Sequence, residues 1–89
     1  MINAGTRFSK NGQIICKEIG GISSLIDPYR RMLVQLNPTA ARIWQLLDGE
    51  RSVTAIIGIL QDEFEIDQRT LEKHVIRFLQ ELFQKEMIE

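Results

Sequence analysis

The sequence predicts an α+β fold in which a three-stranded antiparallel sheet is followed by three helices. Two features predict it. Residues 13–36 contain short β-branched and apolar runs separated by turn residues. Residues 37–89 contain apolar side chains at helical spacing, divided by cap and stop signals. The chain has 89 residues, which is enough for one domain with a single modest core.

Three strands are expected, joined by tight turns. Residues 13–19 (QIICKEI) and 22–27 (ISSLID) flank a Gly-Gly pair, which is typical of a hairpin. The Asp-Pro pair that follows suits the first two positions of a type I turn. Residues 32–36 (MLVQL) then form a third extended run, so the strands should make an antiparallel meander.

Three helices are expected after the strands. Asn37 can cap the first helix, which should begin at Pro38 and end near Asp48. Ser52 can cap the second helix and Asp67 the third. The apolar stripes are Ala40, Ile43, Trp44 and Leu47; Val53, Ile56, Ile57, Leu60 and Phe64; and Leu71, Val75, Phe78, Leu79 and Leu82.

Strands followed by short helices with tight turns are typical of a winged helix-turn-helix-like fold. We divide the chain into an N-terminal arm, residues 1–12, and a folded domain, residues 13–89. The arm has weak periodicity, and the sequence leaves open a flexible segment, a further strand or an arm exchanged between two copies. Gly58, inside the second helix, predicts close packing of another element at that position.

The residues needed for catalysis are scarce. Cys16 and His74 are unique in the chain, so neither an internal disulfide nor a cysteine-based metal cluster is expected. Asp62 and Glu63 are adjacent and diverge on a helix, which makes a poor acid–base pair. No nucleophile or phosphate-binding motif occurs. We therefore predict a protein that is not an enzyme and binds no metal or cofactor.

Nucleic acid is disfavoured by charge. Residues 1–45 carry six basic and two acidic side chains (+4), whereas residues 46–89 carry five basic and ten acidic ones (−5). The predicted second and third helices thus lie in the acidic half of the chain. A helix that reads DNA needs basic surroundings instead. A winged-helix DNA-binding protein that uses Gln68, Arg69 and Lys73 remains the alternative.

A membrane partner is disfavoured by hydropathy. No apolar run approaches the roughly 20 residues that span a bilayer. The N-terminal sequence MINAGTRFSKNG lacks the layout of a signal peptide. We therefore expect a cytoplasmic location.

The third predicted strand offers a binding site if it lies at the edge of the sheet. Residues 32–36 contain no proline and no charge, and an unprotected edge of this kind can accept an extended peptide as a further strand. Ile76 lies outside the main apolar face of the third helix, where it could line a groove beside Lys73 and Arg77. The sequence also allows the edge to be covered by the arm, or buried in a homodimer of a structural subunit.

The segment ISSLIDPYRRMLVQLNPTAARIWQLLDGERSVTAIIGILQDEFEID resembles the PqqD family, the recognition elements of pathways that modify ribosomally made (RiPP) peptides. The matching pieces are LNPTAARIW, LLDG, RSVTAII and a C-terminal KEMIE, and the resemblance covers roughly residues 13–89. It implies a non-enzymatic, winged-helix-like chaperone or adaptor. Such a protein binds the leader segment of a precursor peptide as a further antiparallel strand.

The resemblance also implies a site and partners. Carried onto this chain, the contacts with the leader peptide are Met32, Leu33, Val34, Gln35, Leu36, Lys73, Ile76 and Arg77. A modifying enzyme, such as a radical-SAM protein or a leader peptidase, would be the second partner. Holding the substrate near that enzyme would raise its effective concentration.

Overall fold

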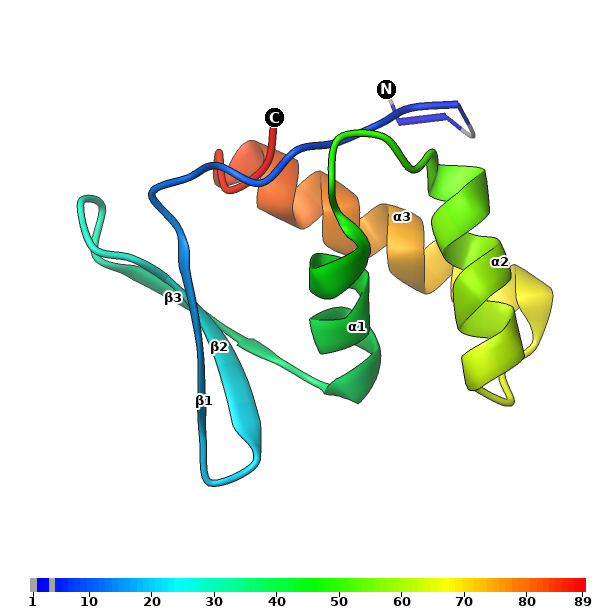
Figure 1. The fold of residues 1–89 in the computed structure, drawn as a ribbon, viewed down its shortest axis with the longest axis horizontal. Helices are drawn as coiled ribbons and strands as arrows, with labels where there is room; N and C mark the ends of the chain where they lie inside the picture. Colours follow the sequence, from blue (N-terminus) through cyan, green and yellow to red (C-terminus); the bar gives the residue numbers. More distant parts are fainter. Residues whose placement is uncertain (1, 4) are drawn as a thin grey trace.

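The computed structural model describes residues 2–3 and 5–89. The strands are β1 (Ile15–Ile19), β2 (Ile22–Asp27) and β3 (Met32–Leu36), and the helices are α1 (Pro38–Leu46), α2 (Val53–Glu63) and α3 (Gln68–Gln84). Figure 1 shows the sheet at one end of the molecule and the helices at the other. The predicted three-stranded antiparallel sheet followed by three helices is confirmed.

The sheet has the order β1-β2-β3, so β1 and β3 are its edges. Both neighbouring pairs are antiparallel, and Leu25 of β2 lies between Cys16 of β1 and Val34 of β3. Leu25 is fully buried. Side chains of directly paired residues lie on the same face of a sheet. The row that contains Leu25 therefore belongs to the inner face, toward the helices.

Each helix begins with the predicted cap. The side chains of Asn37, Ser52 and Asp67 accept hydrogen bonds from backbone N–H groups three residues ahead, at 2.8, 3.2 and 3.2 Å. These bonds satisfy donors that the first helical turn leaves unpaired. Since Asn37 directly follows β3, its cap also fixes the corner at which the edge strand turns into α1.

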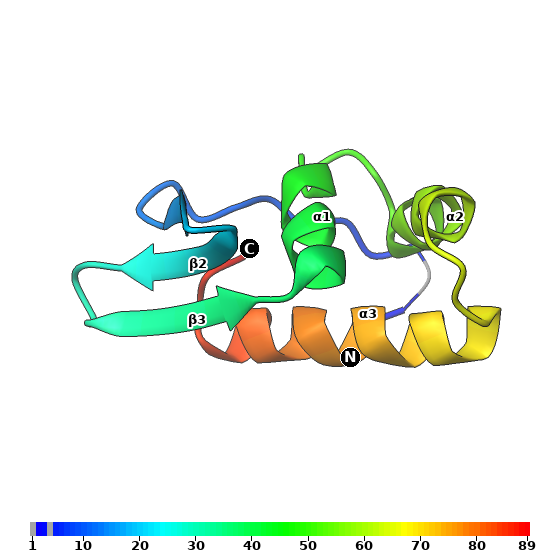
Figure 2. The same cartoon turned by 90° about the horizontal axis from the view of Figure 1, so that it is seen from below.

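The helices enclose the core. α3 runs beneath α1, as Figure 2 shows. It buries one stripe of side chains, and α1 and α2 supply the side chains that lie above it. The buried apolar residues are Phe8, Leu25, Leu36, Ile43, Trp44, Leu46, Leu47, Val53, Ile56, Ile57, Leu60, Leu71, Val75, Leu79, Leu82, Met87 and Ile88.

Two expectations about local geometry were wrong. A Cβ atom at Gly58 would meet nothing within 4 Å, so no element packs closely there. α1 ends at Leu46 rather than near Asp48, because the Asp48 carboxylate accepts the backbone N–H groups of Glu50 and Arg51 and forms a turn. A side chain at Gly49 would be strained, because this residue has φ +81° and a Cβ there would lie 2.5 Å from the Ser9 hydroxyl oxygen.

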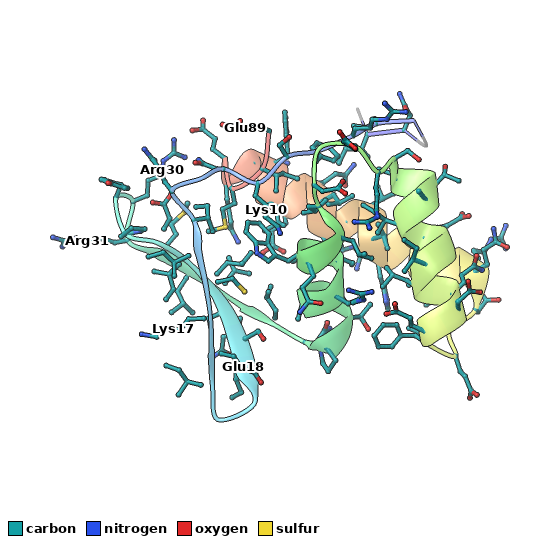
Figure 3. The ribbon with its side chains drawn as sticks, viewed as in Figure 1. Lys10, Lys17, Glu18, Arg30, Arg31 and Glu89 are labelled. Carbon is teal, nitrogen blue, oxygen red and sulfur yellow. The ribbon has the colours of Figure 1, made fainter. Side chains whose placement is uncertain are left out.

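The N-terminal arm crosses the helical part of the molecule. Phe8 is only 5% exposed and belongs to the core. Ser9 exchanges two backbone hydrogen bonds with Glu89, of 3.0 and 2.8 Å, and the Phe8 carbonyl accepts one from Gly49. The ammonium group of Lys10, which is labelled in Figure 3, lies 5.4 Å from the centre of the Trp44 ring, a cation–π contact. The arm is therefore bound to the C-terminal tail and to the α1–α2 connection.

Candidate functional site

β3 has one unoccupied side. It pairs with β2 along Met32–Leu36, and in the part of the chain that the structure describes no other backbone group bonds to it. The arm does not cover it, because its backbone hydrogen bonds reach Gly49, Val53, Met87 and Glu89. A row of N–H and C=O groups along β3 is therefore available to another strand.

The opposite edge, β1, is a poorer acceptor. It carries Lys17 and Glu18, and charged side chains on an edge oppose strand addition. All five of its residues are exposed, and none of these described residues lines the hollows found at the end of β3 and beside α3. β3 carries no charge and leads directly into α1, which packs against α3. Of the two edges, β3 is the one suited to bind a peptide.

A hollow of about 360 Å³ lies where β3 ends, between α1 and α3. It is lined by Asn37, Thr39, Ala40, Ile43, Ile66, His74, Arg77, Phe78 and Glu81. Ile43 is buried, and Ala40, Ile66 and Phe78 are partly buried against the core, so these four give it apolar walls. His74, Arg77 and Glu81 are exposed and supply its polar groups. We name the free edge of β3 together with this hollow the β3–α3 groove.

Arg77 is the available positive charge of the β3–α3 groove. Within residues 2–3 and 5–89 it takes part in no ion pair, whereas Glu81 is paired with Lys85 at 2.7 Å. Arg42, on α1, is also occupied, since its guanidinium donates two hydrogen bonds of 2.8 Å to the Glu63 carboxylate. Those bonds lower the pKa of Glu63 and raise the pKa of Arg42. An acidic ligand would therefore find Arg77 without a competing partner.

The structure brings only some of the predicted contacts together. In β3, the side chains of Met32, Val34 and Leu36 are turned toward the core, whereas Leu33 and Gln35 are exposed. Their backbones share the free edge, and Arg77 lines the adjoining hollow.

Two predicted contacts on α3 do not reach the hollow. Lys73 and Ile76 line a neighbouring depression that Arg77 also borders, and Ile76 lines a further depression with Ile57 of α2. Their assignment as peptide contacts stays a prediction.

Three groove residues on α3 were missed from the sequence. From the sequence, His74 was considered only as a scarce catalytic residue, Phe78 was assigned to the apolar stripe, and Glu81 was not singled out. Their spacing of four and three residues places them one above another on a helix, and this was the available signal.

Other kinds of site find no support in the described residues. Among residues 2–3 and 5–89, no three His, Cys, Asp or Glu side chains are placed to hold a metal ion. Of the helices described, none has the length and apolar character to cross a membrane.

Comparison with protein families identifies a match over most of the chain. Residues 24–88 match the family model for "Coenzyme PQQ synthesis protein D (PqqD)". A curated relative, the PqqA binding protein of Klebsiella pneumoniae, is 40% identical over 60 residues, which are 67% of this chain and 64% of the relative. The PqqA binding protein of Azotobacter vinelandii is 34% identical over 61 residues, which are 68% and 65% of the two chains. The match thus spans just under two thirds of each relative's length.

Two solved structures have the same fold. A lasso peptide synthetase B1 complexed with its leader peptide superposes with a TM-score of 0.80 at 24% identity, over 94% of this chain and 99% of that one. TbiB1 in complex with the TbiA(beta) leader peptide gives 0.77 at 23% identity, over 91% and 94%. The matched residues 24–88 include β3 and α3 and thus both sides of the groove. From this family match, this fold and these relatives we conclude that the chain belongs to the PqqD family.

Proposed function

We propose that this chain is a non-catalytic adaptor that captures the leader segment of a ribosomally made precursor peptide by strand addition and presents it to a modifying enzyme. The observation that carries the proposal is the free edge of β3 beside an apolar hollow. The relatives named as PqqA binding proteins support it, as do the two structures solved with leader peptides.

The β3–α3 groove has the parts that such binding requires. Four or five added backbone hydrogen bonds at about 0.5–1.5 kcal/mol each give several kcal/mol. Ordering a flexible peptide costs about 2–5 kcal/mol of this gain. Micromolar affinity, about −8 kcal/mol, therefore needs side-chain contacts as well. The apolar walls of the hollow at Ile43, Ile66 and Phe78 supply them.

Antiparallel addition would orient the leader peptide. Its amino-terminal part would lie beside Leu36 and the hollow, and its carboxyl-terminal part beside Met32, because β3 runs toward the hollow. An apolar side chain in the hollow, followed or preceded by a carboxylate near Arg77, fits this site. The modified part of the precursor would then extend past the β2–β3 turn, toward a bound enzyme such as a radical-SAM protein or a leader peptidase. We keep the predicted cytoplasmic location for this assembly.

The DNA-binding alternative gains no support from the fold. Arg69 shares one shallow depression with Asp67 and Glu72, and Lys73 shares another with Glu72. These carboxylates would oppose phosphate groups where the predicted DNA contacts lie.

Backbone hydrogen exchange tests the proposal. The chain is compared with and without the leader peptide of the precursor encoded next to it. We expect slower exchange for amides of β3 and altered chemical shifts at His74, Arg77 and Phe78. The amides of β1, an edge with no groove, serve as the internal control. Protection of β1 in place of β3, or none at a saturating peptide concentration, would show that the proposed function is wrong.

A further inference from the structure

The outer face of the sheet is apolar and exposed. The register pairs Ile15 with Ile26 and Ile26 with Leu33, and it pairs Ile19 with Ile22. Since Leu25 is buried on the inner face, the residues adjacent to it in β2, Ser24 and Ile26, point outward, as do the residues paired with them. The side chains of Ile15, Ile19, Ile22 and Leu33 are 49%, 69%, 52% and 61% exposed. We name this surface, with Ile26, the outer sheet face.

The outer sheet face carries positive charge and no carboxylate. Lys17 and Ser24 occupy its middle row, with Gln35 of β3. Glu18 projects to the other side of β1, and Figure 3 shows it on the side opposite Lys17. Arg31, in the adjoining β2–β3 turn, also extends away from the molecule (Figure 3). Among the described residues neither Lys17 nor Arg31 has an ion-pair partner.

We infer that the outer sheet face is the docking surface for the peptide-modifying enzyme, which would present an apolar patch rimmed by carboxylates. This inference rests on the proposed function. Charge complementarity selects such a partner, because acidic side chains would pair with Lys17 and Arg31. A second copy of this chain fits less well. A two-fold interface uses the same face of both copies, so the positive charges of Lys17 and Arg31 would meet a face that is also positive.

Continuity with the peptide site makes the docking dependent on the leader. β3 contributes Leu33 and Gln35 to the outer sheet face and also carries the free edge. A strand added there extends the sheet, so every second side chain of the leader would lie on the same face, next to Leu33.

The small area of the outer sheet face also indicates that enzyme docking depends on the bound leader peptide. Three strands about 4.8 Å apart and five residues long cover on the order of 230 Å². A stable interface buries about 800 Å² on each partner. A fourth strand enlarges the surface by about a third, so the enzyme should prefer the domain with its peptide bound.

Two charge reversals on β1 test the inference. Lys17→Glu alters the outer sheet face, and Glu18→Lys, one residue away on the other face, is the matched control. Both residues are exposed, so both variants should keep the fold, which an amide correlation spectrum verifies. Binding of the leader-loaded domain is measured against the radical-SAM protein or peptidase encoded beside this chain, and leader affinity is measured separately.

We expect Lys17→Glu to weaken enzyme binding about ten-fold and to reduce its salt dependence, while leader affinity changes less than about two-fold. Glu18→Lys should not weaken enzyme binding. The inference would be overturned if both Lys17→Glu and Ile19→Ser bound the enzyme as tightly as the original chain does. So would a concentration-dependent dimer in sedimentation that Ile19→Ser abolishes, because a second copy would then cover the face. Absence of leader binding to the original chain would instead refute the proposed function.

Discussion

At the scale of single residues, Arg77 illustrates how the groove can select its ligand. It lines the hollow at the end of β3 and has no ion-pair partner among the described residues, whereas Arg42 and Lys85 are held by Glu63 and Glu81. A free guanidinium beside apolar walls favours a peptide in which a carboxylate follows or precedes an apolar side chain.

Reversing that charge should weaken peptide binding. We expect Arg77→Glu to reduce the affinity for a leader peptide with acidic residues by about 1–2 kcal/mol, or roughly five- to thirty-fold, because attraction is replaced by repulsion. Fluorescence anisotropy at low and high salt measures the loss, which salt should diminish. Arg69→Glu, on the same helix but outside the hollow, is the control, and an equal loss for both variants would contradict the assignment.

The Asp48 carboxylate should contribute an acid-sensitive part of the stability. Backbone hydrogen bonds from Arg51 and Glu50 lower its pKa below the ordinary value of 3.8. A carboxyl whose pKa falls on folding stabilises the fold above its unfolded pKa, and this stabilisation disappears as the pH falls from about 3.8 through the folded pKa. Asp48→Asn removes the charge. The difference in urea midpoint between Asp48→Asn and the original chain should therefore be larger at pH 7 than at pH 3, and an unchanged difference would refute the prediction.

At the scale of elements, the sequence predicted the existence and the buried stripe of α3. It did not predict which other elements lie on either side of that stripe. Its stripe of Leu71, Val75, Leu79 and Leu82 and its Asp67 cap follow from local spacing. The contact of Ile76 with the peptide stays a prediction, and the hollow at the end of β3 is lined by His74, Arg77 and Phe78 of α3. A hydrophobic pattern fixes the direction of the core from a helix. It does not specify which element lies to either side, because that depends on the path of the rest of the chain.

Truncation of the α3 stripe should cost much of the stability. Leu79 is fully buried, and Leu79→Ala should lower the free energy of unfolding by about 2–5 kcal/mol, because it leaves a cavity in the core. Gln80→Ala, at the next and exposed position, should change it by less than about 0.5 kcal/mol. Urea denaturation of both variants checks this contrast, and similar midpoints would show that α3 does not pack as described.

At the scale of the whole molecule, the N-terminal arm completes the core. Phe8 is buried, and its ring lies 5.9 Å from that of Phe83, centre to centre. Phe83 fell outside the α3 stripe in the sequence pattern, and its partner lies 75 positions earlier in the chain. Such a contact leaves no periodic signal in either segment. This is why the sequence left the position of residues 1–12 open.

Removal of the Phe8 ring should destabilise the whole domain. We expect Phe8→Ala to lower the free energy of unfolding by about 3–5 kcal/mol, a large part of the 5–15 kcal/mol typical of a domain. Arg7→Ala, at the neighbouring exposed position, is the control. Thermal unfolding at several protein concentrations adds a second result. An arm bound to its own chain gives a midpoint independent of concentration, whereas an arm exchanged between copies gives one that rises with it.

The vacant side of β3 also affects how the domain behaves when its ligand is scarce. Unpaired backbone N–H and C=O groups along a proline-free, uncharged edge strand allow copies of the protein to pair edge to edge and aggregate. A leader peptide bound to this edge would occupy these groups and prevent that aggregation. Cells that produce the domain would therefore retain more of it in solution when precursor synthesis keeps pace, which ties the supply of the adaptor to the supply of its cargo.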